Sequence, residues 1–393
     1  MYYFIISFVI FFLGLFCYSP YISNSNDKNE IRFLISFFVY LLVVFFIGLR
    51  FESGGPDWIA YKQFFEYVEP VTKIHTSNYW QNLSSHGFEP LFKIYASIIK
   101  VFSNNYIYLN LFSAVISLYV LFKFYHKATI YPIIAIFLYF SSYSLLGDMT
   151  VVRQMLAVSI FIFSLDDVKN RNFVGFSIKI FFAILFHYSA IILILFYLVY
   201  PLLNYRRFTC ISAFLLISLF ILFGGFTTLL IKSLSFVFSF NDALTFKLTQ
   251  YLKEASAAEI MLGVGFFERT ILFVACIIFK DKIIKKFDVY GNLIINLFIF
   301  NYLISLVFLD FSVFYSRFRY YFVFCIPILY TYFLVLVKQR FVPFFVYLGY
   351  GSLWIYLTVY SAPQMYIPYQ NYIGEILGFE HVDRAKMIED GYE

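Results

Sequence analysis

The stretch that decides the fold class is residues 31–50, IRFLISFFVYLLVVFFIGLR. Between Arg32 and Arg50 it contains no charged side chain. A run of this length crosses the hydrocarbon core of a bilayer as a helix, since one span takes roughly 20 apolar residues. The segment therefore predicts a transmembrane helix that ends in a charge at Arg50.

Comparable apolar runs follow along the 393-residue chain, of which 62% is hydrophobic and only 13% charged. A soluble domain carries about 25% charged residues, so this chain has too little polar surface to be one. We expect a single integral membrane domain over residues 1–393, an all-α polytopic transmembrane bundle of about 11–14 membrane helices. A shorter amphipathic run lies at 90–102. The predicted spans are 3–18, 31–49, 105–122, 129–146, 150–165, 173–201, 209–232, 262–279, 290–309, 318–337 and 341–360.

The run at 173–201 is too long for one straight span. It predicts either two short helices that turn back on each other or one strongly tilted helix. With two short helices there, and with the 90–102 helix re-entrant or interfacial, the clusters of Lys and Arg between runs fall on one side, as the positive-inside rule requires. The other side then holds an external cap at about 51–90, loops at 233–261 and 310–317, and an external tail at about 361–393.

Several classes of function are excluded by composition and by missing motifs. The net charge of +6 is spread over short loop clusters, so it indicates cytoplasmic loops and membrane lipids rather than nucleic acid. The chain has no phosphate-binding glycine loop, no zinc-protease motif and no nucleophile elbow. Cysteine and histidine spacing indicates buried thiols and no metal site, and no cofactor is expected.

Charges inside or at the ends of apolar runs are expensive in a membrane and need a reason. Arg153, in an otherwise apolar helix, is the hardest to explain by solvation. Arg50, Arg317 and Arg319 stand at span ends, where snorkelling to the interface is a sufficient explanation. Under the predicted topology all four gather toward the outer leaflet, where guanidinium groups suit a diphosphate.

His187 is the one histidine within an apolar run. A histidine on an apolar face is often only a hydrogen-bonded core residue, and an Arg in a span is often half of a structural ion pair, for which Asp148 is a candidate partner of Arg153. The functional alternative is that these groups form a site together with carboxylates of the cap, Asp57 and Glu89.

These residues also carry a resemblance to a known family. Gly48-Leu49-Arg50 followed by Gly55-Pro56-Asp57 and Tyr61 resembles the start of the first external loop of the EpsG family of exopolysaccharide polymerases, relatives of the Wzy-type O-antigen polymerases. Further matches in the same order are Glu89-Pro90-Leu91-Phe92, Arg153-Gln154 with Ala157, His187-Tyr188-Ser189, Arg317 through Tyr320-Tyr321, and Pro368-Tyr369.

The resemblance implies a metal-independent glycosyltransferase with a GT-C-like helical fold, in a bacterial inner membrane and in lipopolysaccharide or exopolysaccharide biosynthesis. Such an enzyme would transfer a glycan from undecaprenyl diphosphate to the terminal hydroxyl of another lipid-linked repeat unit. A chain-length regulator protein is a conceivable further partner. His187, Asp57 and Glu89 are then the candidate bases, with no choice among them. The predicted substrate-binding residues are Arg50, Tyr61, Arg153, Gln154, Arg317 and Arg319.

Two other classes compete with this interpretation. A flippase or transporter for lipid-linked oligosaccharides also needs intramembrane arginines, although transporters often show paired halves with broken helices, and no such pairing is visible here. A membrane acyltransferase would place its polar groups toward a cytoplasmic acyl donor, whereas these groups face outward in the predicted topology. An assay with lipid-linked repeat units and no nucleotide discriminates among the three.

Overall fold

The computed structural model describes residues 1–55, 57–84, 87–205, 263–309, 312–337, 341–379 and 381–390, together with positions 211, 214, 215 and 218. Helices dominate these residues, and the pairing between Arg50 and Asn371 is an isolated bridge outside any strand. The predicted all-α class is confirmed. The predicted span 209–232 and loop 233–261 fall almost wholly outside the described residues.

Four described helices are long and apolar enough to cross a membrane: α3 (Lys28–Gly48), α7 (Ile107–Ala128), α15 (Val264–Val307) and, within α18 (Phe341–Ser361), residues Val342–Ser361. A bent pair, Phe314–Tyr320 with Cys325–Leu336, is a candidate fifth. Five further apolar helices have 10–17 residues. The chain is therefore a multi-pass membrane protein, and the count of 11–14 membrane helices stays a prediction.

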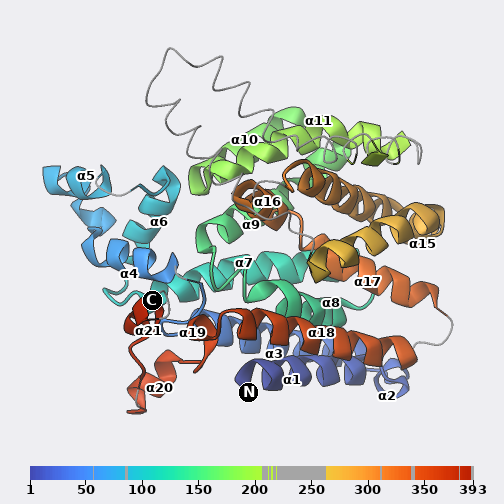
Figure 1. The fold of residues 1–393 in the computed structure, drawn as a ribbon, viewed down its shortest axis with the longest axis horizontal. Coiled ribbons are helices and arrows are strands. Elements are labelled where there is room, and N and C mark those ends of the chain that lie inside the picture. The colour runs from blue at the N-terminus through green and yellow to red at the C-terminus, as the bar shows by residue number, and fades with distance from the viewer. Residues whose placement is uncertain are drawn as a thin grey trace. The chain divides into compact units, whose positions relative to one another are not determined.

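The chain forms two compact units, one of Met1–Ala190 with Pro327–Glu393 and one of Ile191–Ile326. Whether the protein acts as the single domain predicted over 1–393 stays a prediction. In the first unit α1 (Tyr2–Cys17) packs against α3, α8 (Pro132–Tyr139) and α18, while α7 packs against α3 and α9 (Val152–Asn170) (Figure 1). The first unit also contains α2 (Pro20–Ser23), the π-helix η2 (Phe140–Ser144) and α10 (Phe173–Phe186), and the boundary between the units crosses η3 (Tyr188–Ile191) and α17 (Cys325–Leu336).

The segment predicted as a cap, residues 51–90, is itself helical. It contains α4 (Asp57–Tyr67), η1 (Val71–Lys73) and α5 (Ser77–Ser84), and it leads into α6 (Pro90–Ile99). A core of aromatic and aliphatic side chains joins α4 to α6, with Phe64, Phe65 and Phe92 at its centre, all fully buried. Burial of each such ring stabilises the fold by roughly 1.5–3 kcal/mol. This core makes the segment a folded part of the first unit rather than a loose loop.

The tail contains three short helices, α19 (Pro363–Tyr366), α20 (Tyr372–Ile376) and α21 (Arg384–Asp390). Its backbone returns to the end of α3, where the amide of Phe51 donates to the carbonyl of Gln370 over 2.9 Å and the amide of Tyr372 donates to Leu49 over 2.8 Å. Figure 1 shows α21 below α4, and the amide of Gly54 donates to the carbonyl of Met365 in α19 over 3.0 Å. The two segments predicted to share one side of the membrane therefore pack together.

In the second unit, α11 (Ile192–Tyr205) packs against α15, and α16 (Ser312–Tyr320) follows α15 in the chain. α15 has 44 residues, but Asp288 breaks it with φ of 49°. A straight helix of that length would span about 66 Å, twice the hydrocarbon thickness of about 30 Å. The break separates the two spans predicted at 262–279 and 290–309.

Candidate active site

A cluster of Arg153, Glu89, His187 and Tyr61 forms the candidate site, within the first unit. Nη1 of Arg153 donates to Oε2 of Glu89 in an ion pair. Nδ1 of His187 lies 2.8 Å from Oε1 of the same carboxylate. Nε of Arg153 donates to the hydroxyl oxygen of Tyr61 over 3.4 Å. Four residues that the sequence singled out separately are thus joined through one carboxylate and one guanidinium.

Arg153 lies in the first turn of α9, where the helix follows the tight turn of residues 145–151. That turn is held against the cap by two glycines. Gly54 has φ of 112°, and a Cβ on it would lie 2.4 Å from the carbonyl oxygen of Met149. The amide of Gly55 donates to the hydroxyl of Thr150 over 3.0 Å. The close approach fixes the start of α9 against the start of α4 and so brings Arg153 to Tyr61.

Glu89 directly precedes α6, where Pro90 occupies the first helical position, as is common for proline. The carboxylate is buried, with a side chain that is 4% exposed. Burial by itself raises the pKa of Glu89, but the hydrogen bond from His187 and the charge of Arg153 outweigh it and lower that pKa to about 2. Glu89 is therefore ionised at neutral pH and serves as an acceptor, not as an acid.

His187 ends α10 with an extended backbone, φ −159° and ψ 115°, so the run 173–201 breaks at this residue into two short helices. This confirms a break into two short helices, and that the two helices turn back on each other stays a prediction. The amide of Tyr188 also donates to Oε1 of Glu89 over 3.4 Å. Because an ionised carboxylate only accepts, the ring proton of neutral His187 must sit on Nδ1, which leaves Nε2 with a lone pair.

Three aromatic rings surround the guanidinium of Arg153. Its Cζ lies 4.6 Å from the ring centroid of Phe88, 5.6 Å from that of Tyr61 and 6.0 Å from that of Phe92. Ring faces attract a cation and exclude water from it. The Arg153 side chain nevertheless remains 19% exposed. Its Nη2 hydrogen-bonds no acceptor among the described residues.

Asp148 is not the ion-pair partner of Arg153, and that alternative was wrong. Its carboxylate instead accepts hydrogen bonds from Ser117 over 3.1 Å and from Tyr139 over 2.8 Å. The pairing with Glu89, 64 residues away in the chain, arises because α6 and the start of α9 both pack on the core of the cap. The spacing of Glu89 and Arg153 along the sequence did not indicate this pairing.

Arg50 has a different environment. It is 1% exposed, and its guanidinium donates to the carbonyls of Ile47 over 2.7 Å and Ser53 over 3.2 Å and to the side chain of Asn110 over 3.2 Å. It does not snorkel to an interface. These contacts fit a structural tie at the end of α3, and substrate binding by Arg50 stays a prediction.

The remaining predicted residues fall into two groups. Asp57 starts α4, one turn before Tyr61, and Gln154 is buried beside Arg153. Arg317 and Arg319 belong to α16 of the second unit, where the Cζ of Arg319 lies 5.1 Å from the ring centroid of Tyr315. That all of these line one cavity with Arg153 stays a prediction.

The described residues contain no group of three or more His, Cys, Asp or Glu side chains that could hold a metal ion. Three cysteines, Cys17, Cys276 and Cys325, are free and buried, as expected. The fourth, Cys210, lies outside the described residues.

Comparison with known proteins gives one match. The model of the EpsG family matches residues 33–371. The matched range includes Arg50, the cap, all four residues of the cluster and both arginines of α16. No curated protein and no solved structure matches the chain.

Proposed function

The chain belongs to the EpsG family, and from that premise we propose that it polymerises lipid-linked oligosaccharide repeat units. Family membership supports a membrane glycosyltransferase of the polymerase kind. We further propose that the donor is a glycan on undecaprenyl diphosphate, that the acceptor is the terminal hydroxyl of another lipid-linked repeat unit, and that the reaction occurs at the outer face of a bacterial inner membrane. The observation that carries the proposal is the hydrogen-bonded series Arg153–Glu89–His187.

His187 is the proposed general base. Glu89 holds the proton on Nδ1 and orients the ring, so Nε2 is left to take the proton from the acceptor hydroxyl. The acceptor oxygen then forms a bond to the anomeric carbon of the donor glycan. The bond from that carbon to the diphosphate oxygen breaks, and the electron pair leaves with the lipid diphosphate. This assigns Glu89 a positioning role and leaves Asp57 as a less favoured base.

Arg153 is the proposed contact to the diphosphate. Glu89 and Tyr61 use Nη1 and Nε and thereby fix the plane of the guanidinium. The two N–H donors of Nη2 are then left for the ligand, and they would stabilise the negative charge that develops as the leaving group departs. The ion pair with Glu89 reduces the net charge of the cluster, so binding of the anion relies on directed donors rather than on excess positive charge.

The test uses the purified full-length chain in liposomes, lipid-linked repeat units and no nucleotide. We expect a ladder of polymer lengths from the wild type, and none from His187→Ala. His75→Ala serves as the matched control, because His75 is exposed in the cap, and its ladder should equal that of the wild type. Movement of the lipid-linked units across the bilayer without a ladder would instead establish a flippase.

A further inference from the structure

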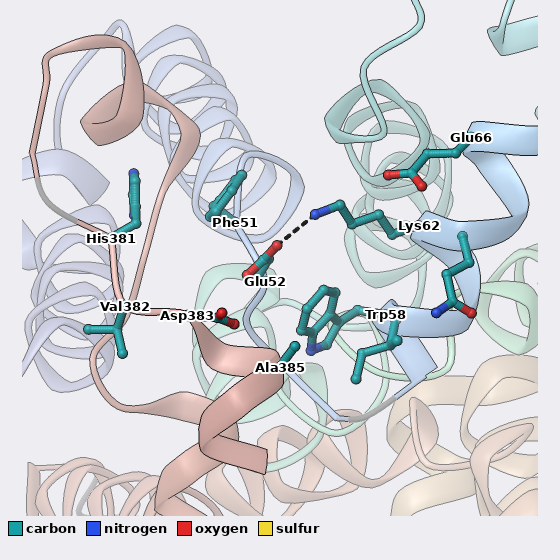
Figure 2. Close-up of a pocket in the computed structure, with 11 residues that line it drawn as sticks. Phe51, Glu52, Trp58, Lys62, Glu66, His381, Val382, Asp383 and Ala385 are labelled. Atoms are coloured by element: carbon teal, nitrogen blue, oxygen red, sulfur yellow. Dashed lines mark hydrogen bonds and ion pairs between the residues drawn. The ribbon is translucent and has the colours of Figure 1, made fainter. Parts of the chain in front are cut away.

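A second feature of the first unit lies beside α4 and is lined by residues of that helix other than Tyr61. It is a pocket of about 500 Å³ between the cap and the tail (Figure 2). Its volume lies within the range of about 300–1,000 Å³ that is usual for small-molecule sites. One wall comes from α4 together with Phe51 and Glu52 before it, and the other from residues 381–385. The lining is Phe51, Glu52, Trp58, Ile59, Lys62, Gln63, Glu66, His381, Val382, Asp383 and Ala385.

The two walls are held together by one residue, Gln370, which is itself buried. Its carbonyl accepts from the amide of Phe51 over 2.9 Å, which fixes the first wall. Its side chain accepts from the amide of Val382 over 2.6 Å and donates back to the carbonyl of Val382 over 3.2 Å, which fixes the second. The pocket is therefore built into the fold and is not a chance gap between loops.

Trp58 supplies an independent sign of a ligand. The residue is 3% exposed, and its indole Nε1 has no hydrogen-bond partner among the described residues. A buried donor without a partner costs about 1–3 kcal/mol, which an oxygen of a ligand would offset. Figure 2 shows the indole ring between Lys62 of α4 and Ala385 of the tail.

His381 adds the complementary group. Nδ1 of His381 lies 3.2 Å from the amide oxygen of Gln370, so the ring proton of the neutral form sits on Nδ1. Its Nε2 is then a buried acceptor, and it too has no partner among the described residues. The lining thus contains one unmatched donor and one unmatched acceptor, on separate walls. The hydroxyl groups of a sugar suit both, because a hydroxyl donates and accepts.

The charge of the lining restricts the ligand further. Glu52, Glu66 and Asp383 are acidic, and Lys62 is the one basic residue of the lining, paired with Glu52 over 2.8 Å. The net charge is negative and disfavours a diphosphate or an acidic sugar. Carboxylates are strong acceptors for hydroxyl and ammonium groups. A neutral or amino-bearing sugar therefore fits the pocket better than a phosphate does.

We propose that this pocket between α4 and the tail binds a neutral or amino sugar of the acceptor glycan. The acceptor role rests on the proposed function, whereas the binding of sugar does not. A smaller pocket of about 170 Å³ shares Phe51, Glu52, Lys62 and Glu66 with it and is also lined by Arg50 and residues 104–107. Residues 381–385 lie beyond the range 33–371 that matches the family model. This position suits residues that select the sugar of this protein better than residues that carry out a reaction common to the family.

Binding is measured on the full-length chain in lipid nanodiscs through tryptophan fluorescence. The chain has three tryptophans, so a variant with Trp80→Phe and Trp354→Phe leaves Trp58 as the sole reporter. The probe is the repeat-unit glycan, released from its lipid and freed of phosphate, from cells that make this protein. We expect the glycan to cause a saturable change in Trp58 emission. Inorganic pyrophosphate, which tests for anion binding, and calcium chloride, which tests for cation binding by the acidic lining, should cause no change.

Two substitutions in the tail locate the binding. Asp383→Asn should weaken the affinity for the glycan by about tenfold, as expected for loss of a charged hydrogen-bond acceptor. Glu375→Gln is the matched control, because Glu375 is an exposed carboxylate of α20 outside the pocket, and its affinity should equal that of the parent. No saturable change with the glycan, or an equal change with pyrophosphate or calcium, would overturn the proposal.

The polymerisation assay distinguishes a failure of the acceptor-sugar site from a failure of the polymerase function. If Asp383→Asn raises KM for the acceptor and leaves kcat unchanged, the pocket is the acceptor-sugar site. If ladders form normally and Asp383→Asn has wild-type KM, the acceptor role fails while the polymerase function stands. If the glycan binds at Trp58 but no ladder ever forms, the polymerase function fails while the sugar site stands.

Discussion

Nδ1 of His187 lies 2.8 Å from Oε1 of Glu89, and the other oxygen of that carboxylate accepts from Arg153. One buried carboxylate therefore holds both the imidazole and the guanidinium in place. Removal of the carboxylate would take away the ion pair of Arg153 and the Nδ1 partner of His187 together, so the positions of both groups depend on Glu89. The predictions below separate the chemistry of this cluster from its contribution to folding.

Glu89→Gln tests the positioning role of the carboxylate. The amide keeps the size of the side chain but loses the charge that pairs with Arg153 and that fixes the proton on Nδ1 of His187. We expect kcat to fall by about 10²–10⁴, the usual contribution of general-base catalysis, with a smaller change in KM. Glu69→Gln is the control, since Glu69 forms a solvent-accessible pair with Lys73 and should retain wild-type rates. A wild-type kcat for Glu89→Gln would remove Glu89 from the mechanism.

The lowered pKa of Glu89, about 2 in the folded protein against an ordinary value of 4.5, predicts a pH dependence of stability. Because the folded pKa is the lower one, ionised Glu89 stabilises the fold fully above about pH 4.5, and the contribution is lost as pH falls toward 2. The difference in Tm between wild type and Glu89→Gln should be constant from pH 7 to pH 5 and shrink in more acidic buffer. A difference that already shrinks between pH 7 and pH 5 would contradict the assignment.

Gly54→Ala tests whether the contact between cap and α9 positions Arg153. An alanine there needs the backbone conformation at φ of 112° and places Cβ 2.4 Å from a backbone oxygen, so the turn before α9 must shift. We expect a lower Tm together with a loss of activity. Gly87→Ala is the matched control and should retain the Tm and activity of the wild type. A Cβ at Gly87 meets nothing within 4 Å, even though this glycine lies only two residues from Glu89 in the chain. Equal Tm and activity for the two variants would show that the contact does not matter.

Arg50→Met tests the structural role of the buried guanidinium at the end of α3. The substitution leaves two backbone carbonyls and the side-chain oxygen of Asn110 without their donor, each at a cost of about 1–3 kcal/mol. We expect a steep fall in Tm and in the amount of folded protein. Lys73→Met removes an exposed charge of the cap and should leave Tm within a degree or two, since surface ion pairs contribute about 0–1 kcal/mol. Normal folding with selective loss of substrate binding in Arg50→Met would favour a direct contact to the ligand instead.

Much of the fold follows from the sequence, because an apolar run of sufficient length has few alternatives in a membrane. The run 31–49 became α3, and the run 105–122 became most of α7. The break at His187 falls within the run 173–201, which is too long for one straight span. The break at Asp288 falls beside the charged cluster that separates the runs 262–279 and 290–309. Element boundaries shifted by a few residues, since caps and turns depend on tertiary contacts.

The site could be predicted only in part. Each of Arg153, Glu89 and His187 stood out by being a charged or titratable group beside apolar residues, but their pairing joins segments 64 and 98 residues apart. No local pattern encodes such a contact. The pocket at Trp58 could not be predicted from the sequence for a similar reason, because its second wall comes from the distant tail. Its residues His381 and Asp383 are unremarkable as isolated polar side chains.

The most direct test of the central claim is the polymer ladder formed by Arg153→Lys, measured with the thermal stability of the same preparation. Lysine keeps the charge opposite Glu89, so the protein should fold with a Tm close to that of the wild type, but it loses the planar set of donors. We predict a loss of about 10²-fold or more in kcat/KM, and no loss for Arg171→Lys, which changes the exposed arginine that caps the same helix. Ladders of wild-type rate and length from folded Arg153→Lys protein would contradict the account.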